Sequence, residues 1–514
     1  MVNLDYEQFL DMMLREIEIC NYIKELSKSV SQISDLIIRN VRIIDPANGE
    51  ISNSVDILIK DGIINRIDSQ IDTVASVEVD GNGKFVFPGL IDMHVHHEVS
   101  NSQHLLHVAN GILAVREMCG YPGILKLRHA INKGEIFAPR LKVASNMLNQ
   151  FELDRYATIV DNPEKARQFV KEFKSRGYDY IKIWNRMPED CFDAIIDESK
   201  LLNIPVVAHI PVGISVKKAV ESGILTFEHF KGYLDDSTMK IPDQDYVTPT
   251  PLTGQWNCPT LKLFDYEKLI GEQALNLLDS KPELRYVSQY QKQIWKKEII
   301  QKTKQVEEQG YNIPKIHFEA QLTIFEKLRT KGVEFIAGTD MGGGYPLTVP
   351  GFGLLEELEI IHEKGLSLLD ALQAATYNAA KPLGLNIGRI RENSPASLFL
   401  VSQNPMDDLK VLRGEKDIII AKRYISDKLR MEILENLEHI FNKTTASKSI
   451  EETENEIVSY FTLPENQIFL RPEYITLMVD FMVERGSRDN AKLLYSKVVE
   501  YTGNKFCEEK MKDL

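Results

Sequence analysis

The stretch FPGLIDMHVHHEVS, residues 87–100, decides the fold because it joins an apolar run to a group of histidines. An apolar run of this length is typical of a buried β-strand. On an extended strand, side chains two residues apart point to the same face, so His94 and His96 point together. Two ligands of one metal ion need this arrangement, although an isolated pair of this kind is a weak indication.

Further strand-like runs follow this stretch, separated by amphipathic helical segments as far as about residue 380. Alternation of this kind predicts parallel βα units. Its persistence favours a closed (β/α)8 TIM barrel over an open sheet, with the active site at the carboxyl ends of the strands. The runs are RLKVAS (140–145), YIKIW (180–184), PVVAHI (205–210), LTFEHF (225–230) and EFIAGTD (334–340).

Ionisable residues stand where several of these runs end. His209 and His229 close two runs and Asp340 closes a third. Each of these histidines alone would be an ordinary hydrogen-bonded core residue about as often as a ligand. Together with His94 and His96 they form a set of imidazoles and a carboxylate that suits a divalent, zinc-like metal ion.

Lys182 is unusual because it lies inside the apolar run YDYIKIW. Burying an ammonium group beside dications costs on the order of several kcal/mol unless the amine is neutral or modified. A lysine whose charged end reaches solvent is the simpler alternative. Its order in the chain, between the His94 strand and the later histidines, favours a role in the site.

The segments that flank the barrel suggest attached units. Short β-rich runs before and after it predict a small discontinuous β-sandwich domain, and the two ends of the chain are helical by pattern. Residues 472–503 resemble one tetratricopeptide-like helix pair, expected to serve as packing or oligomer surface. The predicted divisions are an N-terminal helix (1–34), the first segment of the small β domain (35–88), the barrel (89–384), the second segment of the small β domain (385–429) and a helical extension (430–514).

Composition is that of an ordinary globular protein, with 514 residues, 43% hydrophobic residues and 26% charged residues. The formal net charge of −14 argues against a general attraction to nucleic acid or to anionic membranes. The 5 cysteines form no C-x-x-C pair, and the acidic first residues do not read as a signal peptide. We therefore expect a cytoplasmic protein without nucleic acid or membrane partners, either alone or as a homo-oligomer.

Several separated motifs, in order, resemble the amidohydrolase superfamily. They are FPGLIDMHVH, YIKIW, VVAHI, FEHF and AGTDMGG, supported by WNCPTLKLF and NPMDDL. The resemblance covers roughly residues 36–425 and is strongest to the imidazolonepropionase-like branch, which includes prolidase-like and Xaa-amino-acid carboxypeptidase-like enzymes. It implies a metal-dependent hydrolase that breaks an amide bond of a small molecule, of the dipeptide or N-acyl amino acid type.

The resemblance also implies a binuclear site with two divalent metal ions, of which zinc is the expected one. In that site His94, His96 and Asp340 hold the buried metal and His209 and His229 hold the outer metal. A carboxylated Lys182 bridges the two metals, and Asp340 moves the proton during catalysis. The carbamate replaces a buried cation with an anion that two dications stabilise.

Substrate-binding residues are less well marked. The resemblance implies Tyr233, and His97 is the other candidate because it lies on the loop that follows the first barrel strand. For His97, His104 and His107 a solvated or rim position is the simpler expectation. Residues 144–157 lack the glycine- and histidine-rich loop of the peptidase-like members, which weighs against dipeptidase activity. Hydrolysis of a cyclic amide or lactone, and a catalytically silent scaffold with a helical interaction tail, remain alternatives.

Overall fold

The apolar runs of the central region form parallel strands of one curved sheet. The computed structural model describes residues 6–30, 32–97, 100–151, 157–234, 245–342, 346–443 and 448–502. Along the sheet the strand order is β13-β12-β11-β10-β8-β7-β6, with β9 paired to β8. The strands are β6 (Leu90–Val95), β7 (Ile112–Glu117), β8 (Arg140–Asn149), β9 (Ala157–Ile159), β10 (Tyr180–Ile183), β11 (Val206–Ala208), β12 (Thr226–Glu228) and β13 (Trp256–Cys258).

The barrel closes through residues 335–341, which lie between the two edge strands. On one side the Ile336 amide donates to the Asn257 carbonyl at 3.1 Å. On the other side the Met93 amide donates to Ala337 at 3.0 Å, and the His96 amide donates to Met341 at 2.8 Å. The run EFIAGTD therefore completes the barrel, and the predicted TIM-barrel fold is confirmed.

Helices surround the barrel, and capping residues in the sequence determine where they begin and end. In α4, for example, the Asn162 side chain accepts from the Lys165 amide, Pro163 occupies the first turn, and Gly177 ends the helix at a φ of 88°. The helices between β6 and residue 383 are α2 (Gln103–Ala109), α3 (Pro122–Asn132), α4 (Pro163–Arg176), α5 (Glu189–Leu201), α6 (Val216–Glu221), α7 (Leu261–Glu267), α8 (Gly271–Ser280), η1 (Pro282–Tyr286), α9 (Gln289–Gln309), α10 (Ile313–Lys331), α11 (Phe352–Glu363), α12 (Leu368–Ala374) and α13 (Tyr377–Leu383).

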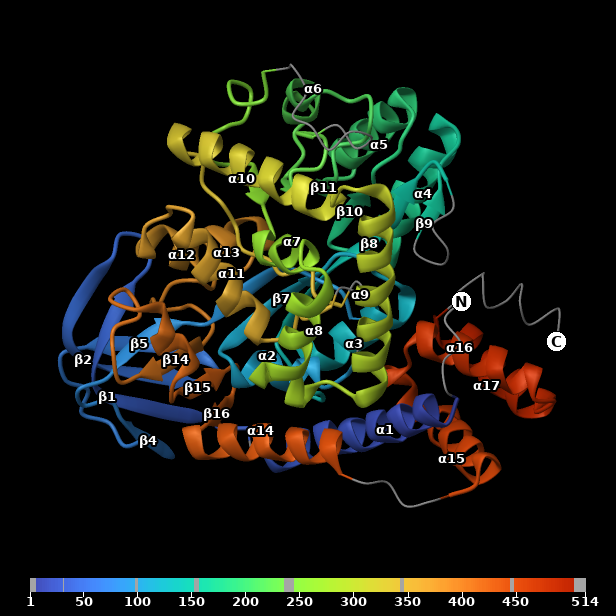
Figure 1. Cartoon of the computed structure of the whole chain (residues 1–514). Helices are drawn as coiled ribbons and strands as arrows, with labels where there is room; N and C mark the ends of the chain where they lie inside the picture. The colour runs from blue at the N-terminus through green and yellow to red at the C-terminus, as the bar shows by residue number, and fades with distance from the viewer. Residues whose placement is uncertain are drawn as a thin grey trace.

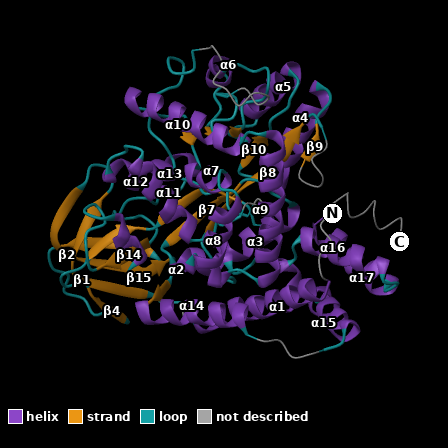
Figure 2. Ribbon diagram, viewed as in Figure 1, coloured by secondary structure: helices purple, strands orange, loops and turns teal. Residues whose placement is uncertain are grey.

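A second sheet is assembled from segments before and after the barrel, in the order β16-β15-β14-β5-β1-β2-β3, with β4 paired to β1. The two segments join where β5 pairs antiparallel with β14, placing Phe87 opposite Phe399. Figure 2 shows this sheet beside the barrel. Its strands are β1 (Asp35–Asp45), β2 (Glu50–Lys60), β3 (Ile63–Asp68), β4 (Val77–Asp80), β5 (Phe85–Pro88), β14 (Ser397–Val401), β15 (Asp417–Ile420) and β16 (Arg423–Ile425); η2 (Leu409–Arg413) lies between β14 and β15.

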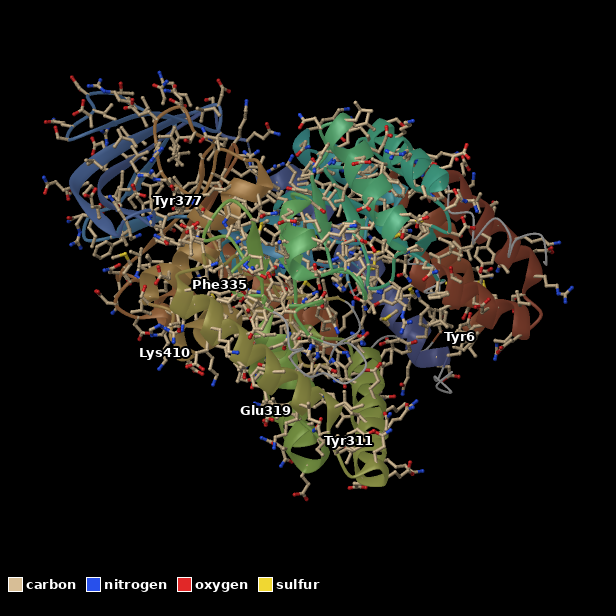
Figure 3. The ribbon with its side chains drawn as sticks, turned by 90° about the horizontal axis from the view of Figure 1, so that it is seen from above. Tyr6, Tyr311, Glu319, Phe335, Tyr377 and Lys410 are labelled. Carbon is tan, nitrogen blue, oxygen red and sulfur yellow. The ribbon has the colours of Figure 1, made fainter. Side chains whose placement is uncertain are left out.

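The two ends of the chain meet in one helical layer, which we call the terminal layer. It contains α1 (Tyr6–Ser29), α14 (Asp427–Asn442), α15 (Ile450–Thr462), η3 (Pro464–Phe469), α16 (Pro472–Glu484) and α17 (Arg488–Thr502). Helix α1 runs alongside α14 and reaches α15 (Figure 1). Near the start of α1, where Figure 3 labels Tyr6 beside the C-terminal helices, the Tyr6 hydroxyl donates to Glu454 Oε1 at 2.7 Å.

An apolar core holds the terminal layer together. Phe9 is fully buried, with its ring near those of Tyr290, Tyr474 and Phe481. Because Tyr290 belongs to α9, this core also ties the layer to the helices outside the barrel. Within the described part of the chain, no helix combines the length and the apolar character needed to cross a membrane.

Candidate metal centre

Three of the predicted ligands meet at the carboxyl end of the barrel. The Nε2 atoms of His94 and His96 lie 3.2 Å and 2.9 Å from Asp340 Oδ1. Both histidines come from the end of β6, and Asp340 ends the closing segment, which is hydrogen-bonded to that strand. One ligand atom from each residue can therefore reach a single metal ion.

The other two histidines lie next to this group. His229 Nε2 is 3.6 Å from Asp340 Oδ2, and the His229 ring is 4.5 Å from that of His94, centroid to centroid. The His209 ring is 5.0 Å from that of His229. The structure therefore places three imidazoles around one carboxylate, with the fourth, His209, next to His229.

Three of the four rings, those of His94, His209 and His229, have a hydrogen-bond partner at Nδ1, whereas His96 Nδ1 has none. His94 Nδ1 lies 2.8 Å from Glu228, His209 Nδ1 lies 2.5 Å from Asn185 Oδ1, and His229 Nδ1 lies 2.6 Å from Thr260 Oγ1. Partners at Nδ1 fix the ring orientation and tautomer of metal-binding histidines. His209 Nε2 has no hydrogen-bond partner and is buried. Rings that are hydrogen-bonded through Nδ1 and can bind through Nε2 are suited to holding a metal ion.

Backbone strain marks the same residues. His229 and Asp340 have φ angles of 59° and 53°, in the left-handed region that residues with a side chain seldom adopt. Such conformations cost of order 1–3 kcal/mol and cluster at active sites. The Asp340 amide donates to the His94 carbonyl at 2.8 Å, which holds the strained turn. At Gly342, which follows, a Cβ atom would collide with the His96 carbonyl oxygen, so glycine is required there.

The electrostatics keep Asp340 ionised. Burial alone favours the neutral acid, but the neighbouring His229 and His94 hold the pKa of Asp340 well below its usual range. Burial together with Lys182 lowers the pKa of His209, and burial is also the main cause of the lowered pKa of His229. An ionised Asp340 beside the neutral imidazoles of His209 and His229 is the state in which these groups bind a metal ion. At His96, by contrast, the neighbouring carboxylates of Asp340 and Glu117 raise the pKa to about 10 despite the burial of the ring.

Lys182 lies in β10 with no exposed surface. Its Nζ has no hydrogen-bond partner, and it lies 5.7 Å from the centroid of the Trp184 ring. Burial lowers the pKa of this amine to about 8, against the opposing effect of Glu228 and Asp340. The simpler alternative, a lysine that reaches solvent, is therefore wrong, and the amine lies where a charged ammonium is least stable.

Glu228 belongs to the candidate centre, although the sequence did not lead us to select it. It is fully buried, binds His94 with Oε2, and accepts from Arg116 Nη2 at 2.8 Å with Oε1. Despite burial, Arg116 and His94 hold the pKa of Glu228 below its ordinary value. The sequence does offer one indication of this pair, because Arg116 and Glu228 are ionisable residues inside apolar strand runs.

Glu228 and Cys258 also approach His94 closely enough to form a second candidate group of metal ligands. The ion pair between Arg116 and Glu228 opposes the binding of a cation there.

The two predicted substrate-binding residues are both buried. The Tyr233 hydroxyl lies 3.2 Å from Thr250 Oγ1, and its ring packs against those of Phe230 and Tyr246. His97 Nδ1 lies 2.6 Å from Glu117, while its Nε2 has no hydrogen-bond partner. His97 thus has an open nitrogen directly after the metal-ligand pair, whereas Tyr233 belongs to the packing at the barrel rim. Their roles in substrate binding stay predictions.

For His97, His104 and His107, expected in a solvated or rim position, the solvated alternative is wrong. All three are buried, and His104 and His107 lie in α2. The segment after β6 coils into a short helix covered by the terminal layer, which the sequence pattern of that segment does not reveal. Within residues 144–157, the stretch that lacks the glycine- and histidine-rich pattern, positions 152–156 lie outside the described residues.

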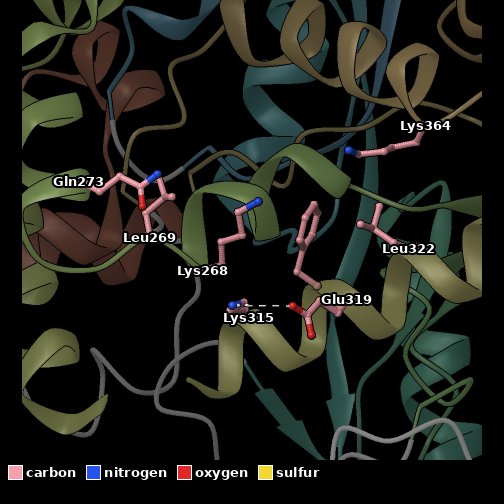
Figure 4. Close-up of a pocket in the computed structure, with 8 residues that line it drawn as sticks. Lys268, Leu269, Gln273, Lys315, Glu319, Leu322 and Lys364 are labelled. Atoms are coloured by element: carbon pink, nitrogen blue, oxygen red, sulfur yellow. Dashed lines mark ion pairs between the residues drawn. The ribbon is translucent and has the colours of Figure 1, made fainter. Parts of the chain in front are cut away.

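A separate surface cavity of about 390 Å³ lies over α7, α8 and α10 (Figure 4). Lys268, Lys315 and Lys364 surround it, with the Lys268 amine over the Phe318 ring at 4.4 Å. Lys315 lies 4.0 Å from Glu319. None of the predicted metal ligands lines this cavity, so it is distinct from the candidate metal centre.

Comparison with known proteins identifies a matching family and several relatives. A family model described as "Amidohydrolase family" matches residues 85–430. Over 63 residues the chain is 43% identical to a dihydroorotase of Trichlorobacter lovleyi (12% of this chain), and it spans only 15% of that relative's length. Over 445 residues it is 21% identical to an ochratoxinase of Aspergillus niger, covering 73% of this chain and 82% of the relative.

Solved structures share the fold. A bottromycin amidohydrolase superposes with a TM-score of 0.69 at 18% identity, covering 82% of this chain and 94% of its own. A Xaa-Pro dipeptidase with bound methionine superposes with a TM-score of 0.58 at 20% identity, covering 76% of this chain and 100% of its own. Residues 6–29 and 431–502, which form most of the terminal layer, lie outside the family match.

Proposed function

Because the chain belongs to the amidohydrolase family, we propose that it is a metal-dependent hydrolase that cleaves an amide bond of a small molecule. The substrate class we propose is a dipeptide or an N-acyl amino acid. The observation that carries the proposal is the convergence of His94, His96, His229 and Asp340 at the mouth of the barrel. This is where barrels of this type place their catalytic groups.

The proposed site holds two divalent metal ions, with zinc as the expected metal. His94, His96 and Asp340 would hold the buried metal, and His209 and His229 the outer one. Lys182 would bridge them as a carbamate, formed when its neutral amine adds carbon dioxide and releases one proton. The buried, unpartnered Nζ supports this assignment, since an anion bound to cations is more stable there than an isolated ammonium.

The chemistry supplied by such metal ions when bound is polarisation of the amide carbonyl and a lowered pKa for a water molecule. Asp340, kept ionised by its neighbours, would take a proton from the attacking water molecule and pass it to the departing nitrogen. Glu228 and Asn185 hold His94 and His209 so that Nε2 faces the site. We assign His97 and Tyr233 to substrate binding.

The test is metal content and turnover of the full-length protein. Plasma mass spectrometry on protein purified without chelator and with bicarbonate should give about two metal ions per chain. Lys182→Ala should reduce this to about one or fewer, while the exposed-face control Lys171→Ala should not. One metal ion per chain in the unaltered protein would contradict the binuclear site, and none after reconstitution would overturn the proposed function.

A second candidate is hydrolysis of a cyclic amide by the same residues. The short matches to dihydroorotases favour it, although they cover little of those proteins. A panel of dipeptides and N-acyl amino acids should be compared with hydantoins and lactones on the same metal-loaded protein. We expect kcat/KM to be highest for an acyclic acid, and a higher value for a cyclic compound would select the second candidate.

A further inference from the structure

A buried polar junction joins the terminal layer to the loop between β6 and α2. The backbone amide and the side-chain amide of Asn101 donate to Glu16 Oε2 at 3.0 Å and 3.2 Å. Arg471 Nη2 donates to Asn101 Oδ1 at 2.9 Å. Glu16 comes from α1 and Arg471 precedes α16, so both ends of the chain bind the same loop residue. All three side chains are at least nine-tenths buried.

This loop begins at the candidate metal centre. His97, directly after the predicted ligand His96, binds Glu117 Oε2 through its backbone amide at 2.7 Å and through Nδ1 at 2.6 Å. Glu117 Oε1 in turn lies 3.5 Å from His96 Nδ1. The terminal layer and the candidate metal centre therefore contact two residues of the same loop, Asn101 and His97.

Donor and acceptor groups at this junction remain open. Arg471 Nη1, His97 Nε2 and His104 Nε2 are buried and have no hydrogen-bond partner. The rings of His97 and His104 are 5.2 Å apart, and the charge of Arg471 adds to burial in lowering the pKa of both. An unsatisfied buried guanidinium N–H is costly. A ligand that offers an oxyanion to Arg471 Nη1 would remove that cost.

The open donor of Arg471, rather than the net charge around it, favours an anion over a cation. Among the residues that the structure describes, Arg471 makes no direct ion pair with a carboxylate, and Asn101 separates it from Glu16. Arginine is well suited to a carboxylate because its planar group presents several donors in fixed positions. A metal ion at His97 and His104 would instead be repelled by the same guanidinium.

We propose that Arg471 and His97 form a subsite for a carboxylate of the substrate, so that the terminal layer selects acids over neutral compounds. The proposal rests on the proposed function for its substrate class and adds a residue from outside the family match. Arg471 contacts the carboxylate directly, whereas Asn101 and Glu16 position the loop and the guanidinium.

The experiment uses the full-length, metal-loaded protein and isothermal titration calorimetry. The tightest-binding acid from a panel of N-methylsulfonyl-L-amino acids, whose sulfonamide the proposed amide hydrolysis does not cleave, is compared with its primary carboxamide, which lacks the carboxylate. We expect the unaltered protein to prefer the acid, and Arg471→Ala to weaken binding of the acid by about 10- to 100-fold while binding of the amide changes little. Arg471→Lys should keep some of the preference because it keeps the charge.

Two further variants separate recognition from structure. Arg488→Ala removes an exposed arginine of the same layer and should leave both affinities unchanged. Asn101→Ala disturbs the junction but not the charge, so it should weaken binding of acid and amide by similar factors. The ratio of the two affinities is insensitive to a partly unfolded sample.

Three results would overturn the subsite. They are the failure of every acid to bind, an equal affinity for acid and amide in the unaltered protein, and an unchanged preference in Arg471→Ala. Because the readout is binding, it stands apart from turnover. A protein that binds acids through Arg471 but hydrolyses no amide would refute the proposed function and keep the subsite, while amide hydrolysis without an effect at Arg471 would do the reverse.

Discussion

The barrel mouth and the terminal layer bury very different groups. At the mouth, imidazoles, a carboxylate and an amine are buried with open nitrogens at Lys182 and His209. In the terminal layer the buried groups are mostly apolar, such as Phe9, Met13 and Met478, packed in one cluster. Buried open polar groups cost stability and are retained for binding, whereas apolar packing supplies stability. The two regions meet at Asn101, where the layer contributes polar groups of its own.

The largest expected effect is at the mouth, from Asp340→Asn. The amide keeps the size of the side chain but cannot take a proton, so kcat should fall by at least about 10³-fold. Steady-state kinetics on metal-loaded protein, with metal content measured on the same sample, check this. Full activity in the variant would show that Asp340 does not carry the proton and would remove the main contrast between the two regions.

Glu228→Gln tests whether the buried partner of His94 belongs to the site. Losing the carboxylate leaves Arg116 unpaired and weakens the orientation of the ring, so metal affinity should fall by about 10- to 100-fold. Competition with a chelator measures the metal affinity of the variant and of the unaltered protein. Glu356→Gln is the matched control, because Glu356 is also buried and paired with a cation, Lys281, outside the centre. Equal losses in both variants would reduce Glu228 to a structural role.

Phe9→Ala addresses the terminal layer directly. Removing this fully buried ring should cost about 3–5 kcal/mol of stability, as Phe→Ala changes in packed cores do. Chemical denaturation and limited proteolysis of the tail measure the loss. Metal content should stay near that of the unaltered protein. A loss of bound metal would mean that the layer supports the centre itself, which would weaken the distinction between the two regions.

Glu357→Gln should give the smallest effect, seen in the pH dependence of stability. Glu357 is buried and accepts from the backbone amides of Leu261 and Lys262 at 3.0 Å and 2.7 Å. Burial raises its pKa to about 8. The folded state therefore holds a proton that the unfolded state releases, and stability falls as pH rises from about 4.5 to about 8.

The amide variant removes that proton linkage. Its unfolding free energy should change less between pH 5 and pH 8 than that of the unaltered protein, where this one group contributes a slope of up to about 1.4 kcal/mol per pH unit. Urea denaturation at several pH values provides the measurement. Parallel pH profiles for the two proteins would place the pKa of Glu357 near its ordinary value.

Much of the barrel and the candidate centre was predictable because their signals are local. An apolar run and the polar residue that ends it are adjacent in the chain, so His94, His96, His209, His229 and Asp340 could be selected one strand at a time. The family inferred from these motifs is confirmed. His104 and His107 were misplaced because their burial depends on helices from both ends of the chain, which no local pattern near residue 104 records.

By itself, the sequence determined the order of strands, the residues at their ends and the unfavourable position of Lys182. These properties follow from hydrophobic periodicity and from the cost of burying a charge. Tertiary structure alone decided that Glu228 supports His94 and that Arg471 reaches Asn101, 370 positions away in the chain. Such contacts depend on how whole elements pack, and side-chain hydrogen bonds between distant segments leave no periodic trace in a single sequence.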